Sequence, residues 1–211
     1  FDVVGVDIKA QPSYPFTFYR ADALTYPLEG FDAVHASPPC QSFTAYRRKG
    51  HGVGDGYKDL IRPIRDRIGA ATYVIENVPR SPLLSPVTLC GSSFGLDVRR
   101  HRLFESSVDL IAPACDHGWQ LPRFPPATNR SNLRRTVEVG VWRIPLATQR
   151  AAMGIKWMTV AELSQAIPPS YTYCVGRQLA LELGGISDTT TAPGSLALIG
   201  LDISELHGRL S

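Results

Sequence analysis

His35-Ala36-Ser37-Pro38-Pro39-Cys40-Gln41-Ser42-Phe43-Thr44 combines two consecutive prolines with a single cysteine and a polar segment. It follows the apolar segment Phe31-Asp32-Ala33-Val34, which predicts a short buried strand. Two consecutive prolines cannot continue a strand ladder or enter a helix interior, so the chain must turn before Cys40. Because ligands bind at the carboxyl ends of strands in open α/β sheets, Cys40 is either buried filler or a nucleophile at such an edge. The polar residues Gln41 and Ser42 that follow it favour the nucleophile.

Composition indicates a globular chain with a sizeable core. The chain has 211 residues, of which 44% are hydrophobic and 19% charged, and its net charge of +3 permits nucleic-acid binding without arguing for it. No apolar run approaches membrane-spanning length, and no signal-peptide pattern opens the chain. The four cysteines are widely spaced, which favours free thiols in a reducing cytoplasm. We therefore expect a cytoplasmic protein, monomeric and without a membrane partner.

Further polar residues follow other predicted strands. A run of valines ends in Asp7, and Phe16–Tyr19 predicts a strand that precedes Asp22. On the residues alone, a solvated loop acid is the favoured interpretation of Asp7, whereas a turn cap and a ligand-binding acid are equally favoured for Asp22. Thr72–Ile75 predicts a buried strand that delivers Glu76 to the same edge as Cys40, although a capping or salt-bridged acid is an alternative interpretation of Glu76.

Four motifs together resemble the cytosine-5 DNA methyltransferase family. Ser37-Pro38-Pro39-Cys40-Gln41 resembles its nucleophile motif, and Glu76-Asn77-Val78, Arg100-His101-Arg102-Leu103-Phe104 and the segment 167–179 follow in the family's order. The match covers most of residues 2–184 and is similar to the compact, phage-type members. It implies a Rossmann-like, doubly wound α/β methyltransferase sheet with a short irregular target-recognition insert.

The resemblance also implies a reaction, the transfer of a methyl group from S-adenosyl-L-methionine to carbon 5 of cytosine in double-stranded DNA. Cys40 would add to carbon 6 of a flipped base, Glu76 would protonate or hydrogen-bond the ring nitrogen, and Arg102 would steady the ring carbonyl. Residues 99–104 predict a strand on which Arg100 shares a face with Arg102, so Arg100 is a further candidate.

The implied cofactor contacts lie at strand ends and in the late segment: Asp7, Ile8, Asp22, Ala23, Pro38, Tyr171 and Thr172. The family's glycine-rich loop should precede Val3, and no glycine cluster stands there. Because the chain also begins with Phe1, it resembles a fragment that lacks its first strand. We therefore expect weak cofactor binding, which upstream residues would restore.

The expected organisation is a catalytic domain over residues 1–104, a target-recognition insert over 105–148, a return to the catalytic domain over 149–186 and a peripheral tail over 187–211. Helical spacing predicts a core helix within 57–69, and Thr159 with Glu162 forms a capping box that predicts a helix start. Candidate DNA contacts come from a basic glycine-rich loop and from the insert: Arg47, Arg48, Lys49, Arg130, Arg134 and Arg135.

Several alternatives remain open. Cys115-Asp116-His117 suggests zinc, but two ligands without a second pair are a weak signal, so we expect no metal and interpret Cys90 as structural. An RNA cytosine-5 methyltransferase of the same family and a catalytically dead nucleic-acid-binding remnant are alternative functions. A cysteine hydrolase is less favoured, because no histidine lies in a convincing site motif for pairing with Cys40.

Overall fold

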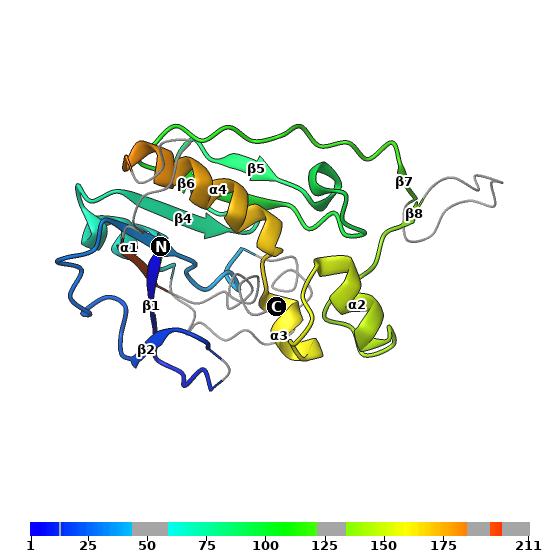
Figure 1. Ribbon diagram of the computed structural model, residues 1–211, viewed down its shortest axis with the longest axis horizontal. Helices are drawn as coiled ribbons and strands as arrows, with labels where there is room; N and C mark the ends of the chain where they lie inside the picture. The colour runs from blue at the N-terminus through cyan, green and yellow to red at the C-terminus, as the bar shows by residue number, and fades with distance from the viewer. Residues whose placement is uncertain (13, 44–58, 122–133, 185–194, 200–211) are drawn as a thin grey trace. The chain divides into compact units, whose positions relative to one another are not determined.

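The structure, a computed structural model, is a mixed α/β fold with a seven-stranded sheet, a two-stranded sheet and, among the described residues, four α-helices (Figure 1). It describes residues 1–12, 14–43, 59–121, 134–184 and 195–199. This part of the chain divides into two compact units. The first comprises Phe1–Thr88, Arg102–Ile111 and Val175–Leu201, and the second includes Leu89–His101 and Ala112–Cys174.

The large sheet has its strands in the order β2 (Thr17–Arg20), β1 (Asp2–Asp7), β9 (Ser195–Ile199), β3 (Ala33–Ala36), β4 (Tyr73–Asn77), β6 (Arg102–Ser106) and β5 (Val87–Leu89). The pairs from β2 to β4 are all parallel, whereas β6 is antiparallel to β4. The carboxyl ends of β1 to β4 therefore lie at one edge of the sheet, together with the amino end of β6. The strands predicted around residues 16–19 and 72–75 are confirmed, and the strand predicted at 31–34 lies two residues later.

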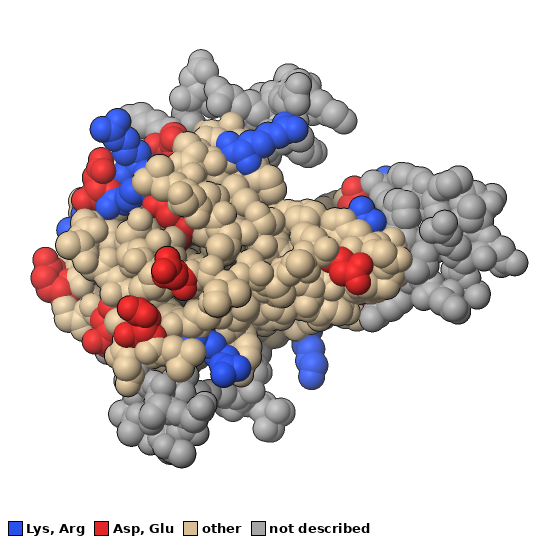
Figure 2. Space-filling view, turned by 90° about the horizontal axis from the view of Figure 1, so that it is seen from above, with Lys and Arg blue, Asp and Glu red and all other residues tan. Residues whose placement is uncertain are grey.

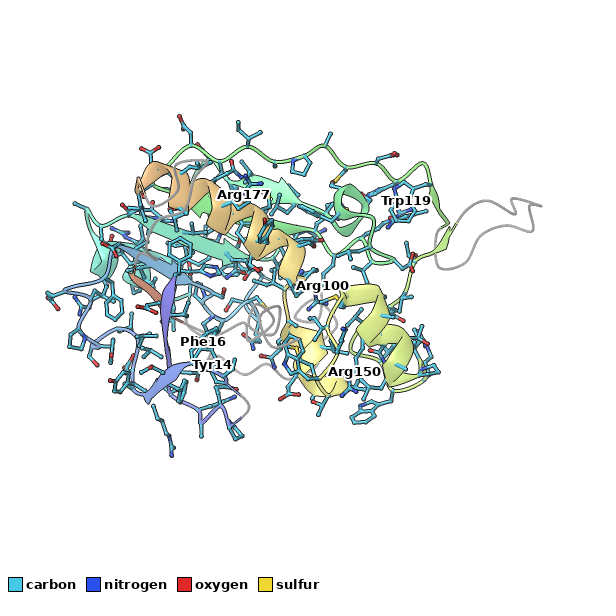
Figure 3. The ribbon with its side chains drawn as sticks, viewed as in Figure 1. Tyr14, Phe16, Arg100, Trp119, Arg150 and Arg177 are labelled. Carbon is cyan, nitrogen blue, oxygen red and sulfur yellow. The ribbon has the colours of Figure 1, made fainter. Side chains whose placement is uncertain are left out.

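A glycine in β1 lets an aromatic ring lie against the sheet. A Cβ built on Gly5 would come within 2.6 Å of ring atoms of Tyr14, so any larger residue would displace that ring. Tyr14 also packs edge-on against Phe16, with ring centroids 6.1 Å apart (Figure 3). Its ring lies edge-on to that of Phe18 as well, at 5.7 Å. This aromatic cluster anchors the loop between β1 and β2.

The core of the first unit forms where α1 (Ile61–Ile68) covers β3 and β4. Its residues Ile61, Ile64 and Ile68 are buried because their spacing places them on one helix face, and they pack in a cluster with Val34 and Ile75. The helix predicted within 57–69 is thus confirmed over Ile61–Ile68, and it ends at Gly69 with a φ of 62°.

A buried carboxylate ties α1 to β6. Glu105 is 1% exposed and accepts two hydrogen bonds of 2.6 Å from Arg65, one from the Tyr73 hydroxyl at 2.9 Å and one from the Leu84 amide at 2.7 Å. Burial alone would raise the pKa of Glu105, but these hydrogen bonds and the Arg65 charge outweigh it and lower that pKa. The ionised form is therefore the stable one in the fold.

The end of the chain departs from the sequence-based expectation. The prediction that residues 187–211 form a peripheral tail is wrong for Ser195–Ile199, because β9 pairs in parallel with both β1 and β3 inside the sheet. Its sequence, Ser-Leu-Ala-Leu-Ile, has the apolar character of a central parallel strand. In this position β9 satisfies backbone groups on both neighbours, where a first strand was expected to be missing.

The second unit is richer in loops. It contains a short 3₁₀ helix η2 (Gly91–Phe94), the paired strands β7 (Gln120–Leu121) and β8 (Arg134–Arg135), α2 (Leu146–Met153) and α3 (Val160–Gln165). The predicted capping box is confirmed, since Thr159 accepts from the Glu162 amide and Glu162 accepts from the Thr159 amide. The helix α4 (Pro169–Glu182) begins in this unit and ends in the first. The insert expected over 105–148 differs from this unit, because β6 continues to Ser106 and residues 89–101 also belong here.

No helix in the described ranges combines the length and the apolar character that crossing a membrane requires.

Candidate functional site

The loop that carries Cys40 is fixed by the neighbouring strand. β3 ends at Ala36, and the chain turns through the buried Pro38 to the half-buried Cys40. The Asn77 side chain, 1% exposed at the end of β4, donates a 2.9 Å hydrogen bond from Nδ2 to the Pro38 carbonyl. After Cys40 the chain turns again, because the Phe43 amide donates to the Cys40 carbonyl at 2.9 Å. Two hydrogen bonds thus fix the described part of this loop at the carboxyl edge of the sheet, next to β4.

Glu76 and Arg102 form a buried ion pair at the same edge. Arg102 Nε lies 3.0 Å from Glu76 Oε1, and the two side chains are only 13% and 8% exposed. The sheet register explains the contact: Glu76 lies opposite Phe104 on β6, and Arg102 stands two residues before Phe104 on the same face. A buried ion pair gives little net stability compared with apolar residues of similar volume, whereas removal of one partner leaves the other charge buried and unpaired.

Arg100 does not continue this strand, so the prediction that it shares a face with Arg102 is wrong. β6 begins only at Arg102, and Arg100 has a φ of 32°, which strand residues do not adopt. Its guanidinium donates to the carbonyls of Ser164 and Ala166, both at 2.7 Å, near the end of α3 (Figure 3). These bonds satisfy carbonyls that the short helix leaves open and give Arg100 a structural role in the second unit.

The two predicted adenosine-binding acids lie at adjacent strand ends. Asp7 ends β1, and its Oδ1 accepts from the Lys9 amide at 2.7 Å. Asp22 follows β2, and its Oδ1 accepts from the Leu24 amide at 2.9 Å, so it does cap the turn that includes the half-buried Ala23. The Ala21 amide donates to the Asp7 carbonyl and holds the two ends together.

An apolar side chain stands beside these acids. Ile8 follows Asp7 directly, just after the end of β1, and is 63% exposed. The carboxylates of Asp7 and Asp22 could accept hydrogen bonds from ribose hydroxyls or an amino group, and Ile8 could cover a purine ring. Such a combination is chemically compatible with an adenosine group.

The late-segment residues are already engaged in the second unit. Tyr171 is fully buried, and its hydroxyl donates to the Arg99 and Arg100 carbonyls at 3.2 and 3.0 Å. Its ring lies 5.2 Å from that of Phe94, and the Thr172 hydroxyl donates to the Pro169 carbonyl. These contacts explain both side chains as parts of the local core.

The predicted DNA contacts are only partly covered by the structure. Arg47, Arg48, Lys49 and Arg130 lie outside the described residues. Arg134 and Arg135 form β8, whose backbone pairs with β7. In the view of Figure 2, basic and acidic side chains of the described residues are interspersed, so this face shows no uniformly basic surface.

One group of side chains was not anticipated. Cys115 and His117 were expected to lack a second pair of ligands, but the structure brings Cys90 and His101 beside them. The sequence signal is weak because the two added residues are separated from each other and from Cys115 by more than the short spacing typical of zinc motifs. Burial, with His117 and Arg99 close by, lowers the pKa of His101.

Comparison with known proteins gives no further assignment. No protein-family model matches the chain, and neither a curated protein nor a solved structure matches it.

Proposed function

We propose that the protein is a methyltransferase that modifies carbon 5 of cytosine in DNA through a covalent adduct with Cys40. The observation that carries this proposal is the buried Glu76–Arg102 pair at the sheet edge where the Cys40 loop begins. A nucleophile, a carboxyl group and a guanidinium are the groups that this reaction needs around one pyrimidine ring.

The arrangement of strands supports a Rossmann-like sheet. On one side of β9 the strands follow in the order β1, β2 toward the edge of the sheet. On the other side they follow in the order β3, β4, so the strand order reverses at β9. In open parallel sheets, ligands bind at the carboxyl edge next to such a reversal. Asp7, Ile8 and Asp22 lie on one side of it and Cys40 on the other, which would bring a bound adenosine group and the nucleophile to a common edge.

The chemistry assigns a role to each residue of the site. Carbon 5 of cytosine is a weak nucleophile, so the Cys40 thiolate adds to carbon 6 and the ring electrons move toward carbon 5. Glu76 hydrogen-bonds or protonates the ring nitrogen, and Arg102 holds Glu76 in place while it donates to the ring carbonyl. When bound, S-adenosylmethionine supplies the methyl group. Loss of the carbon 5 proton to a base then expels the thiolate and restores the ring.

The reaction requires the base to leave the stacked duplex. Flipping it out costs a few kcal/mol, which contacts with the flipped base and the phosphates must offset. The Glu76–Arg102 pair is suited to binding the flipped base, because its polar groups are already shielded from water and need little reorganisation when the base enters.

Methyl incorporation tests the proposal. The chain would be incubated with methyl-labelled S-adenosylmethionine and either duplex DNA or RNA of mixed sequence. We expect label in the cytosines of DNA, no label with Cys40→Ser, and a loss of about 10²–10⁴-fold with Glu76→Gln. Cys174→Ser is the matched control, since Cys174 lies on α4 outside the site, and it should retain activity.

Two results would contradict the proposal. Label in RNA alone would identify an RNA methyltransferase. Binding of DNA with no transfer to either substrate, under conditions in which the cofactor is bound, would identify a nucleic-acid-binding protein without this activity.

A further inference from the structure

Four metal-ligating side chains gather in the second unit. They come from three separate segments: Cys90 precedes η2, His101 precedes β6, and Cys115 and His117 lie on the extended chain before β7. Their ligand atoms all lie within 4.8 Å of one another. Cys90 is fully buried, whereas Cys115 is exposed, so the group extends from the core of the unit to its surface.

The distances agree with a tetrahedral site. The Cys90 Sγ atom lies 3.2 Å from His117 Nε2, and Cys115 Sγ lies 3.3 Å from His101 Nε2. Zinc–sulfur and zinc–nitrogen bonds of about 2.3 and 2.05 Å give a sulfur–nitrogen separation of about 3.6 Å around a tetrahedral ion. The observed pairs are thus a few tenths of an ångström short of that value, which small side-chain rotations would correct.

The segment that carries Cys90 is shaped by backbone contacts. The Gly91 amide donates to the Arg99 carbonyl at 2.8 Å, and the Leu96 amide donates to the Gly91 carbonyl at 2.9 Å. A Cβ on Gly91 would lie 2.1 Å from the Val98 carbonyl oxygen, so glycine is required for this close turn. The turn returns the chain to His101, which brings two ligands that are eleven positions apart in sequence, Cys90 and His101, into one group.

Hydrogen bonds also join this turn to the segment that carries the other two ligands. The Ser92 hydroxyl donates to Cys90 Sγ at 3.1 Å, and it accepts from the Asp116 amide, between Cys115 and His117, at 3.2 Å. The Gln120 side chain donates to the Leu96 carbonyl at 2.8 Å. A hydroxyl that donates to a ligand sulfur is the kind of outer contact that orients and stabilises metal-bound thiolates.

We propose that Cys90, His101, Cys115 and His117 together bind one zinc ion, which holds the loops of the second unit in place. Two thiolates and two imidazoles are a donor set that zinc prefers, and four protein ligands leave no open position for catalysis. The sequence predicts no metal because it shows no second pair of ligands near Cys115 and His117. In the structure, Cys90 and His101 supply that second pair. On binding, each thiol loses its proton to solvent, and the two thiolates balance the charge of the ion. The Cys90 thiol, which donates to the Arg99 carbonyl at 3.1 Å, would give up that bond.

A structural ion would have a clear physical purpose here. The second unit has few regular elements, and a metal that joins three loop segments stabilises the folded state by its binding free energy. The proposal is independent of methyl transfer, and its test requires no enzymatic activity.

The test measures metal in the full chain purified under reducing conditions without chelators. Elemental analysis by mass spectrometry should give one zinc per chain. Cys115→Ser should lower this content at least tenfold, whereas Cys174→Ser, the control outside the cluster, should leave it unchanged. Cys115 is the suitable position because it is exposed, so its replacement disturbs the core least.

A second measurement covers the case in which a variant does not fold. Zinc would be removed from the wild-type chain and replaced by cobalt, which should give the intense visible bands of a tetrahedral ion and a thiolate-to-cobalt charge-transfer band. Added zinc should bleach these bands and raise the melting temperature of the metal-free chain.

Three results would overturn the proposal. The first is a wild-type chain that contains no zinc and gives no thiolate-to-cobalt band. The second is an equal zinc content in the wild type and in folded Cys115→Ser, and the third is a Cys90–Cys115 disulfide in the reduced preparation.

Discussion

His35 on β3 provides a pH-dependent test of the sheet that carries the candidate nucleophile. Its Nε2 atom is shielded from solvent and has no hydrogen-bond partner among the described residues, although the side chain as a whole is only half-buried. Burial lowers the pKa of His35 from 6.5 to about 4. The native ring is therefore neutral between these values, while the ring in the unfolded chain takes up a proton. Stability must then fall as the pH is lowered through this range.

The size of the effect follows from the two pKa values. Proton uptake by the unfolded chain favours unfolding by about 2 kcal/mol at pH 5 and by only about 0.2 kcal/mol at pH 7. With a urea dependence of about 2 kcal/mol per molar, the unfolding midpoint should fall by about 1 M between pH 7 and pH 5 through His35 alone.

Urea unfolding followed by far-ultraviolet circular dichroism at pH 7, 6 and 5 measures this shift in the wild type and in His35→Gln. The variant removes the titrating ring, so it should show a smaller loss of stability, by about 2 kcal/mol, over the same range. Carboxylates such as Glu105, whose pKa is lowered, act at lower pH and contribute equally to both chains. Equal losses in wild type and variant would refute the reasoning about a shielded, neutral ring.

The remaining predictions concern packing and positioning. Arg65→Met should destabilise the fold by about 3–5 kcal/mol, because it leaves buried Glu105 without a counter-charge, and adding Glu105→Gln should recover part of this loss in urea unfolding. Gly5→Ala should cost about 1–3 kcal/mol through its clash with the Tyr14 ring, and Tyr14→Leu in that background should reduce the cost. Asn77→Ala should lower kcat for methyl transfer more than it changes KM for DNA, since it frees the nucleophile loop; a change in KM alone would contradict this.

Sequence patterns located the first unit well, for physical reasons that can be named. The helical spacing of Ile61, Ile64 and Ile68 predicts one buried helix face. The short apolar run at residues 72–75 predicts a buried strand. The sequence therefore predicts that Glu76 lies near a strand end. Its partner Arg102 was named as a candidate, but the ion pair depends on the β4–β6 register, which local sequence does not encode.

The errors arose where long-range contacts override local pattern. Arg100 alternates with Arg102 as strand residues would, yet hydrogen bonds to the end of α3 and a positive φ remove it from the strand. The strand at Ser195–Ile199 is short and follows a stretch rich in Thr, Gly and Pro. Its position becomes clear only from its long-range pairing with β1 and β3. The cluster of Cys90, His101, Cys115 and His117 depends in the same way on a turn at Gly91. Its ligands are too far apart in sequence to form a recognisable zinc motif.

Covalent trapping tests the central claim most directly. The chain would be incubated with S-adenosylmethionine and a mixed-sequence duplex in which 5-fluorocytosine replaces cytosine. Fluorine at carbon 5 cannot leave as a proton does, so the adduct between the enzyme and carbon 6 persists after methyl transfer. Denaturing mass spectrometry should find one DNA strand attached to the peptide that contains Cys40, and none attached to Cys40→Ser. Absence of an adduct with the wild type, or an undiminished adduct with Cys40→Ser, would contradict the assignment.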